Sequence, residues 1–355
     1  MKVRLGDYIQ EYSVKNKDDE NISVYSVTNT KGFCKDYFGK EVASKDKTTY
    51  KIVPYGYFAY NPSRINVGSV DWQRKEKKVI VSPLYNVFSV SPNLERQYLY
   101  YYLKSDFVLQ RIKAVATGSV RDNLKLSMLY EFPIELPKLE NQRKIVKILD
   151  KVSDVVEKKE QELEQLDTFV KSRFAEMFGD PIQNPYNWSI KSLLEMGYCK
   201  NGMNFHTGDS GIELYCLGVG DFKDYSIIDG TDQLSKISLN EMPPEESMLQ
   251  NGDIVFVRSN GNKDLVGRCV LVYPHDVQTT YSGFCIRYRL TSREVNKNYL
   301  LRVLKTDSMR KQMTGRGANI QNLNQKTLAT LNIPIPPIEL QNQFADFVVS
   351  TDKSK

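Results

Sequence analysis

The side chains that most often do chemistry, histidine and cysteine, are few and widely spaced in this chain. Two histidines, His206 and His275, lie far apart, and five cysteines form no C-x-x-C pair. This pattern argues against a disulfide framework, a zinc site or a histidine-based triad. We expect the cysteines to be small buried hydrophobic residues in a reducing compartment. They are Cys34, Cys199, Cys216, Cys269 and Cys285.

No motif for a catalytic cofactor is evident. There is no G-x-x-x-x-G-K-[ST] phosphate loop, and no G-x-G-x-x-G follows a predicted strand. Asn184-Pro185-Tyr186 is similar to the Asn/Asp-Pro-Pro-aromatic motif of amino-methyltransferases, but it lacks the second proline and no glycine-rich loop precedes it. A turn after a helix is the preferred interpretation. We therefore expect no catalytic residue, no metal and no cofactor on this chain.

The charge balance is mildly basic. The formal net charge is +6, with 21 basic and 15 acidic side chains in residues 1–137 against 17 and 16 in residues 180–337. A basic surplus is compatible with binding nucleic acid, although it does not require it. No apolar run approaches the roughly 20 residues of a membrane helix, and the start does not read as a signal peptide. These features predict a cytoplasmic protein without a membrane partner.

Several segments of the first half of the chain match segments about 200 residues later, and the matches follow the same order in both halves. Tyr98–Asp106 matches Tyr299–Asp307, and Gly118–Leu124 matches Gly317–Leu323. Shorter matches precede these pairs, and the two Pro–Glu–Gln segments near residues 137 and 337 follow them. Collinear matches over so many segments indicate a tandem duplication of one α+β domain.

A long helix is predicted between the copies. Residues 139–178 contain neither proline nor glycine, and Gly179-Asp180-Pro181 ends the pattern. Apolar residues recur with steps of four and three, as in a coiled coil, with Lys159 and Arg173 interrupting the seam. An amphipathic helix packed along one domain remains the alternative. The apolar seam residues are Ile145, Leu149, Val152, Val156, Leu163, Leu166, Val170 and Met177.

The central helix also carries a family resemblance. Leu136–Asp150, continuing to Phe174–Pro181, resembles the central conserved region of specificity (S) subunits of type I restriction–modification systems. Pro336–Phe347 resembles the start of their distal conserved region. The Gly252–Phe256 strand and the Gly317–Leu323 loop are similar to target-recognition-domain motifs. The resemblance covers essentially the whole chain.

The resemblance implies an α+β fold in which two tandem α/β target recognition domains are joined by a long coiled-coil helix. The expected parts are target recognition domain 1 (1–137), the central helix (138–179), target recognition domain 2 (180–337) and the start of a distal helix (338–355). The distal helix is short against the family's pattern, in which the two helices pair antiparallel. We therefore expect either a truncated second helix or a variant assembly, with possible self-association through the central helix.

The resemblance further implies a non-catalytic subunit that binds double-stranded DNA. Its partners would be two methyltransferase (M) subunits and the endonuclease/translocase (R) subunits of a phage-defence system. S-adenosylmethionine, ATP and Mg²⁺ are expected on the partner subunits only, and the modification would be adenine methylation.

Candidate DNA contacts follow from residue type and loop position, because basic side chains neutralise phosphates while Arg, Asn, Gln and Lys reach base edges. For each residue alone, a solvated surface charge or a turn-capping amide is an equally good interpretation. In the first copy the candidates are Arg64, Asn66, Arg74, Lys75, Lys77, Lys78, Arg121 and Asn123. In the second copy they are Arg258, Asn260, Asn262, Lys263, Arg268, Arg316, Asn319, Gln321 and Asn322.

Three other readings stay open at the level of sequence. The chain could be the recognition subunit of a type IIB-like system, whose partner fuses methyltransferase and nuclease. It could be a catalytic methyltransferase, against which the missing cofactor loop argues. It could also be a coiled-coil scaffold that never touches DNA.

Overall fold

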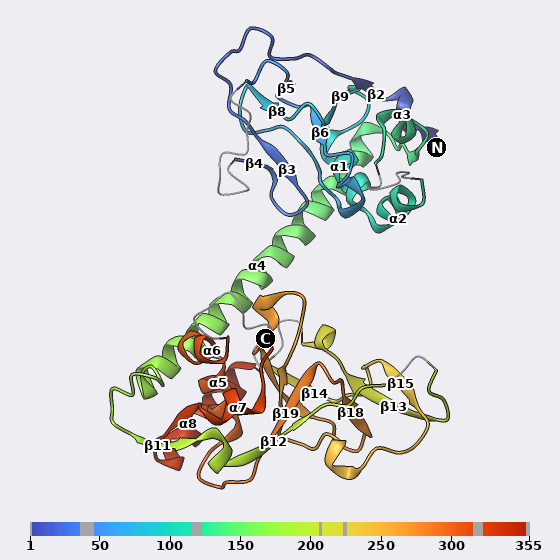
Figure 1. Ribbon diagram of the computed structural model, residues 1–355. Helices are drawn as coiled ribbons and strands as arrows, with labels where there is room; N and C mark the ends of the chain where they lie inside the picture. Colours follow the sequence, from blue (N-terminus) through green and yellow to red (C-terminus); the bar gives the residue numbers. More distant parts are fainter. Residues whose placement is uncertain are drawn as a thin grey trace. The chain divides into compact units, whose positions relative to one another are not determined.

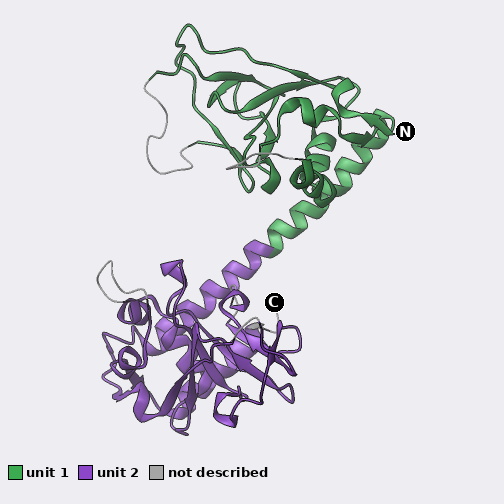
Figure 2. Cartoon of the chain, turned by 45° about the vertical axis from the view of Figure 1, so that its right-hand side comes forward, with its two compact units in different colours: residues 1–159 green, residues 160–355 purple. Residues whose placement is uncertain are grey.

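A computed structural model describes residues 2–35, 46–115, 123–205, 208–222, 226–314 and 322–352. The chain forms two compact units, residues 1–159 and 160–355 (Figure 2). The division falls inside helix α4 (Leu139–Phe178), so this helix contributes residues to both units (Figure 1). The long helix expected from the sequence is therefore present.

The first unit packs three helices against one face of an antiparallel sheet (Figure 1). Phe58 and Tyr60 of the central strand face the helices, whereas Ala59 faces a second core on the opposite side, as the two-residue period of a strand requires. Leu99 and Leu103 complete the first core from the helix side. The sheet is β2 (Ile9–Glu11), β9 (Asn86–Val90), β6 (Phe58–Tyr60) and β7 (Val70–Trp72); the helices are α1 (Arg96–Lys104), α2 (Asp106–Val115) and α3 (Leu126–Tyr130). Three strand pairs accompany them: β1 (Lys2–Arg4) with β10 (Pro133–Glu135), β3 (Ser26–Thr28) with β4 (Gly32–Cys34), and β5 (Lys51–Pro54) with β8 (Lys78–Val81).

The second unit has the same plan with larger sheets, and its helices gather on one side of them (Figure 1). Its five-stranded sheet has the order β12 (Gly197–Asn201), β19 (Cys285–Leu290), β16 (Asp253–Val257), β17 (Cys269–Tyr273) and β14 (Ile227–Asp229). A three-stranded sheet has the order β15 (Lys236–Leu239), β13 (Ile212–Leu217) and β18 (Thr279–Tyr281). The remaining strands and α-helices are β11 (Ser189–Ser192) paired with β20 (Asn332–Ile335), α5 (Lys297–Leu304), α6 (Asp307–Thr314), α7 (Gln325–Ala329) and α8 (Ile338–Asp352).

The structure shows the repeat in its strand register. The order β2-β9-β6-β7 of the first unit recurs as β12-β19-β16-β17 in the second, and each unit closes with two helices, a short helix and a returning strand. Phe58 pairs with Phe88 as Ile254 pairs with Tyr288. The turns before the two central strands both need glycine, because Gly56 and Gly252 have φ of +84° and +90°.

A buried glutamine fixes the start of α4 and of α8 in the same way. The Gln142 side-chain oxygen accepts from the Glu95 N–H at 2.8 Å, and its amide nitrogen donates to the carbonyls of Asn93 and Pro137 at 3.0 and 2.9 Å. Gln341 repeats all three bonds, with Asn296, Glu294 and Pro336 as partners. Both side chains are 0% exposed. Each glutamine therefore ties a helix to the loop before α1 or α5.

The buried face of α4 differs from the predicted seam near the helix end. Val170, Phe174 and Phe178 are buried against Tyr299 and Phe344 of the second unit. The seam predicted from the sequence runs instead through Val170, Arg173 and Met177. Arg173 pairs with Glu176, and Met177 is only partly buried.

Two effects account for the difference. Residues spaced by four, such as Val170, Phe174 and Phe178, lie on nearly the same face of a helix with 3.6 residues per turn. The two phenylalanines also carry more apolar area than Arg173 and Met177 of the predicted seam.

Nearer the middle of α4, the predicted seam residues are more exposed: Val152 and Val156 are 55% and 51% exposed and Leu163 is 39% exposed. Ile145 is 36% exposed, while Leu149 and Leu166 are half-buried.

No helix within the described ranges combines the length and apolar character required to cross a membrane.

Candidate nucleic-acid interface

In the second unit, most candidates predicted from the sequence lie on one group of loops. The Leu323 N–H donates to the Arg258 carbonyl at 2.8 Å, and Ser259 forms an antiparallel bridge with Asn322. Asn322 therefore lies beside the segment that carries Arg258, Asn260 and Lys263. The Arg258 guanidinium donates to the carbonyl of Gly283 at 3.3 Å, which adds the β18–β19 turn to the group.

Two amide residues of this group also have local roles. The Asn260 side-chain oxygen accepts from the Asn262 N–H at 2.8 Å, and the Asn262 oxygen accepts from the Asp264 N–H at 3.0 Å. These bonds shape the loop, so part of each amide is engaged as a turn cap. Asn262 and Lys263 are exposed, whereas Arg258 and Arg268 are partly buried.

The first unit repeats this arrangement. The Leu124 N–H donates to the Pro62 carbonyl at 3.1 Å, and the Tyr60 hydroxyl donates to the Leu124 carbonyl at 3.0 Å. Asn123, which is exposed, is thereby held beside the segment that carries Arg64 and Asn66. The same two loops therefore meet at equivalent places in both units.

The other described first-unit candidates lie on the β7–β8 connection and at the first residue of β8, and two of them are engaged within the protein. The Arg74 guanidinium is paired with Asp71 at 3.0 Å and lies over the rings of Trp72 and Tyr100, 4.9 and 5.8 Å from their centroids. Asp71 is 3% exposed, so Arg74 compensates a buried carboxylate. Lys78 forms an ion pair with Glu20, while Lys75 and Lys77 are exposed.

Four candidates, Arg121, Arg316, Asn319 and Gln321, lie outside the described residues.

The structure adds amide side chains that sequence reasoning missed. Asn204 lies so close to Gly283 that a Cβ on the glycine would come within 2.1 Å of the amide oxygen. The Gln325 amide donates to the Asn201 side chain at 3.3 Å. We call Asn204, Arg258, Ser259, Gly283 and Asn322 the second-unit loop cluster. Their shared location depends on strand pairing between distant segments, so residue spacing alone could not have revealed it.

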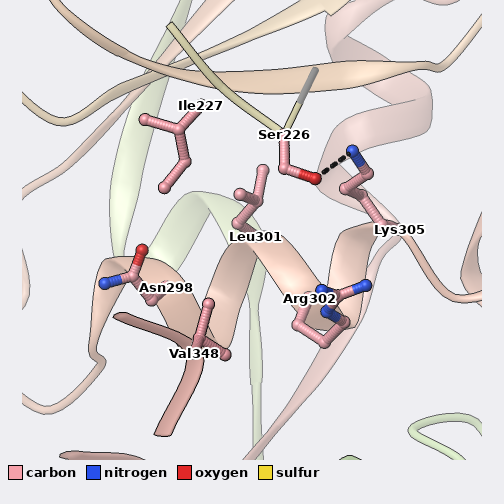
Figure 3. A pocket seen from close by; sticks show the side chains of 7 residues that line it. All are labelled: Ser226, Ile227, Asn298, Leu301, Arg302, Lys305 and Val348. Atoms are coloured by element: carbon pink, nitrogen blue, oxygen red, sulfur yellow. Dashed lines mark hydrogen bonds between the residues drawn. The ribbon is translucent and has the colours of Figure 1, made fainter. Parts of the chain in front are cut away.

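Basic residues at the C-terminal end of α5 form a separate group. The Lys305 ammonium donates to the Ser226 hydroxyl at 2.8 Å beside a cavity of about 20 Å³ (Figure 3). Burial, reinforced by the nearby cations Arg302 and Arg268, lowers the pKa of Lys305. The cavity is large enough for about one water molecule. It therefore offers no room for an organic ligand.

A larger cleft of about 270 Å³ lies next to this group in the second unit. Lys171, Arg302 and Lys305 line it together with two acids, Asp180 and Asp307. The mixed charges give it no clear preference for an anion.

The described residues show no group of three or more His, Cys, Asp or Glu side chains that could hold a metal ion. Asn184 bonds both backbone groups of Trp188, donating to its carbonyl at 2.8 Å and accepting from its N–H at 3.0 Å. These bonds explain Asn184-Pro185-Tyr186 as a turn.

Comparison with known proteins gives a consistent result. A family model for the type I restriction modification DNA specificity domain matches residues 3–168 and 223–355. The specificity subunit of the type I restriction enzyme StySPI from Salmonella potsdam is 27% identical over 272 residues, which is 71% of this chain and 56% of that protein. The MjaVIII specificity subunit of Methanocaldococcus jannaschii is 22% identical over 378 residues, covering 99% of this chain and 85% of that one. The chain thus spans little more than half the length of the Salmonella relative.

A solved structure supports the fold. The type I restriction–modification S subunit from M. genitalium aligns with a TM-score of 0.54 at 15% identity, covering 100% of this chain and 89% of that chain. At this level of identity the likeness concerns the fold alone.

Proposed function

Because the chain belongs to the family of type I restriction–modification specificity subunits, we propose that it reads a bipartite DNA site. Each unit would recognise one half-site through its group of loops, and α4 would set the gap between the two. The chain itself would catalyse no reaction.

One observation carries this proposal: equivalent loops meet in both units. The bonds from Leu124 to Pro62 and from Leu323 to Arg258 hold them in the same way. The loops carry Arg, Lys and Asn side chains, the types that contact phosphates and base edges. Since α4 runs through both units for 40 residues, it would be about 60 Å long at the usual helical rise.

The proposal includes the partners. Two methyltransferase subunits and the endonuclease/translocase subunits would assemble on the chain in the cytoplasm. S-adenosylmethionine, ATP and Mg²⁺ would bind to those partners. The exposed apolar positions Val152, Val156 and Leu163 of α4 are available for helix–helix contacts of this kind.

The test is selection of DNA from a random duplex library by the purified full chain. We expect a motif of two short blocks separated by a fixed number of unspecified base pairs. We also expect binding of random duplex to be weaker and to fall steeply with salt, because phosphate contacts release counterions. Failure to bind any duplex at low salt would support the scaffold alternative.

A second measurement tests the alternative that the chain is itself a methyltransferase. Calorimetric titration of the chain with S-adenosylmethionine should give no binding signal. A stoichiometric signal would revive the methyltransferase reading.

A further inference from the structure

A matched pair of exposed apolar side chains projects from the two units. Leu84 is 78% exposed between β8 and β9, and Phe284 is 61% exposed between β18 and β19. The residues that follow them, Tyr85 and Cys285, are buried. Strand register makes the two turns equivalent, because β9 pairs with β6 as β19 pairs with β16.

The same hydrogen bonds hold both turns. The Tyr85 N–H donates to the Ser82 carbonyl at 3.1 Å, and the Cys285 N–H donates to the Ser282 carbonyl at 2.8 Å. The serine hydroxyls accept from the N–H groups of Leu84 and Phe284 at 3.5 and 3.3 Å. Each apolar side chain is therefore presented outward on a backbone that is already ordered.

Single exposed hydrophobic residues are common and by themselves imply no function. The repeat provides the discrimination, because the exposed aromatics described in the first unit have polar counterparts, and the exposed Val67 corresponds to Val266, which is buried. Tyr55 is 60% exposed and corresponds to Asn251, while Phe107 is 63% exposed and corresponds to Ser308. The apolar character at Leu84 and Phe284 is kept although the two units differ widely in sequence.

The backbone of Phe284 adjoins the polar residues of the candidate interface. Its carbonyl accepts from the N–H groups of Arg258 and Ser259 at 2.8 and 3.3 Å, so it is an immediate neighbour of the second-unit loop cluster. Asn204 lies against the adjacent Gly283, and Asn322 lies against Ser259. An exposed apolar side chain on a segment next to amide and guanidinium groups suits a base pair, which has polar edges and apolar faces.

We propose that Phe284 and Leu84 are apolar wedges, each packing against a base step of its own half-site while the surrounding polar loops contact base edges and phosphates. Phe and Leu are among the side chains that proteins insert at base steps, where they partly unstack the bases. This inference rests on the proposed function, because it needs a DNA site for each unit.

The test uses the full chain and the duplex selected from the random library. Phe284→Ala and Leu84→Ala should each weaken binding of that duplex at least tenfold. The slope of log affinity against log salt should stay unchanged, because no phosphate contact is removed. Phe284→Leu should keep most of the affinity, since the first unit uses leucine at this position.

Phe107→Ala is the matched control, with the same residue type at nearly the same exposure, and it should leave binding unchanged. All four variants should melt like the wild type by circular dichroism, because the side chains are exposed. A 2-aminopurine placed at the affected step should brighten when the wild type binds and stay dim with Phe284→Ala.

The outcomes separate the two proposals. Wild-type affinity of Phe284→Ala for the selected duplex, or a change only in its salt slope, would overturn the wedge and leave DNA reading intact. If the wild type selects no motif at all, the proposed function fails first and the wedge fails with it.

Discussion

At the scale of single residues, burial controls the reactivity of the cysteines. It raises the pKa of Cys199, Cys216 and Cys285 to about 12 and that of Cys269 to about 11. Because the thiolate is the nucleophile, these thiols are neutral and unreactive at pH 8. Iodoacetamide at pH 8 should therefore modify these four cysteines only after denaturation, whereas Cys34, which is partly exposed, should react in the folded protein. Peptide mass spectrometry checks this, and rapid labelling of Cys269 in the native chain would contradict it.

Arg74 is expected to stabilise the folded first unit. Arg74→Ala removes the guanidinium that is paired with the buried Asp71 carboxylate, which keeps the N–H groups of Phe33 and Trp72 as donors. We expect the free energy of unfolding to fall by about 1–2 kcal/mol, since Arg74 is itself partly exposed. Lys75→Ala, at the exposed neighbouring position, should change it by less than about 0.5 kcal/mol. Urea unfolding of both variants measures the difference, and equal stabilities would show that the pair contributes nothing.

Sequence reasoning identified the types of residues at the candidate interface but not how they group. Arg64, Asn66, Arg258 and Asn322 stood out because they are basic or amide residues in loops. Asn204 and Phe284 did not, because they reach the loop cluster only through pairing between strands far apart in the chain. Lys78 was selected for its charge, although its ion pair with Glu20 could not be read from spacing.

At the scale of elements, the glutamine at the start of α4 and of α8 stabilises the attachment of that helix to the loop before α1 or α5. Gln142→Ala would remove a fully buried side chain and leave one backbone N–H and two carbonyls, which are partly buried, without this partner. We expect a loss of about 3 kcal/mol in the free energy of unfolding, because each unsatisfied buried group costs about 1–3 kcal/mol. Gln165→Ala, on the exposed part of the same helix, is the control and should be neutral. A thermal midpoint of Gln142→Ala equal to that of the control would contradict this role.

The long helix was the most predictable element, since it contains no helix breaker between Leu139 and Phe178. Its packing was less predictable. The heptad pattern continued the seam through Arg173 and Met177, whereas the structure buries Phe174 and Phe178. A periodic pattern specifies a stripe along a helix, but the partner aromatics Tyr299 and Phe344 decide which neighbouring positions are covered.

At the scale of the whole molecule, the exposed apolar residues in the middle of α4 predict that the chain associates with other helices. Val152, Val155 and Val156 are 55%, 60% and 51% exposed on one helix. Apolar stripes of this kind usually mark an interface, so the purified chain should self-associate or require partner helices. Val156→Asp or Leu163→Asp should dissociate the assembly and leave the thermal midpoint of the folded units unchanged, because both positions are exposed. Analytical ultracentrifugation checks this; a wild-type monomer at micromolar concentration would contradict self-association.

If the chain reads two DNA half-sites whose spacing follows α4, shortening this helix must shorten the gap between the half-sites. Deleting Val156–Glu162 removes seven residues, keeps the phase of the seam and shortens the helix by about 10.5 Å, or about three base pairs of DNA. Wild type and deletion variant are then used in parallel to select duplexes from the same random library. We expect the deletion variant to select the same two half-site sequences with a gap about three base pairs shorter. Altered half-sites at an unchanged gap, or a single uninterrupted motif for the wild type, would contradict it.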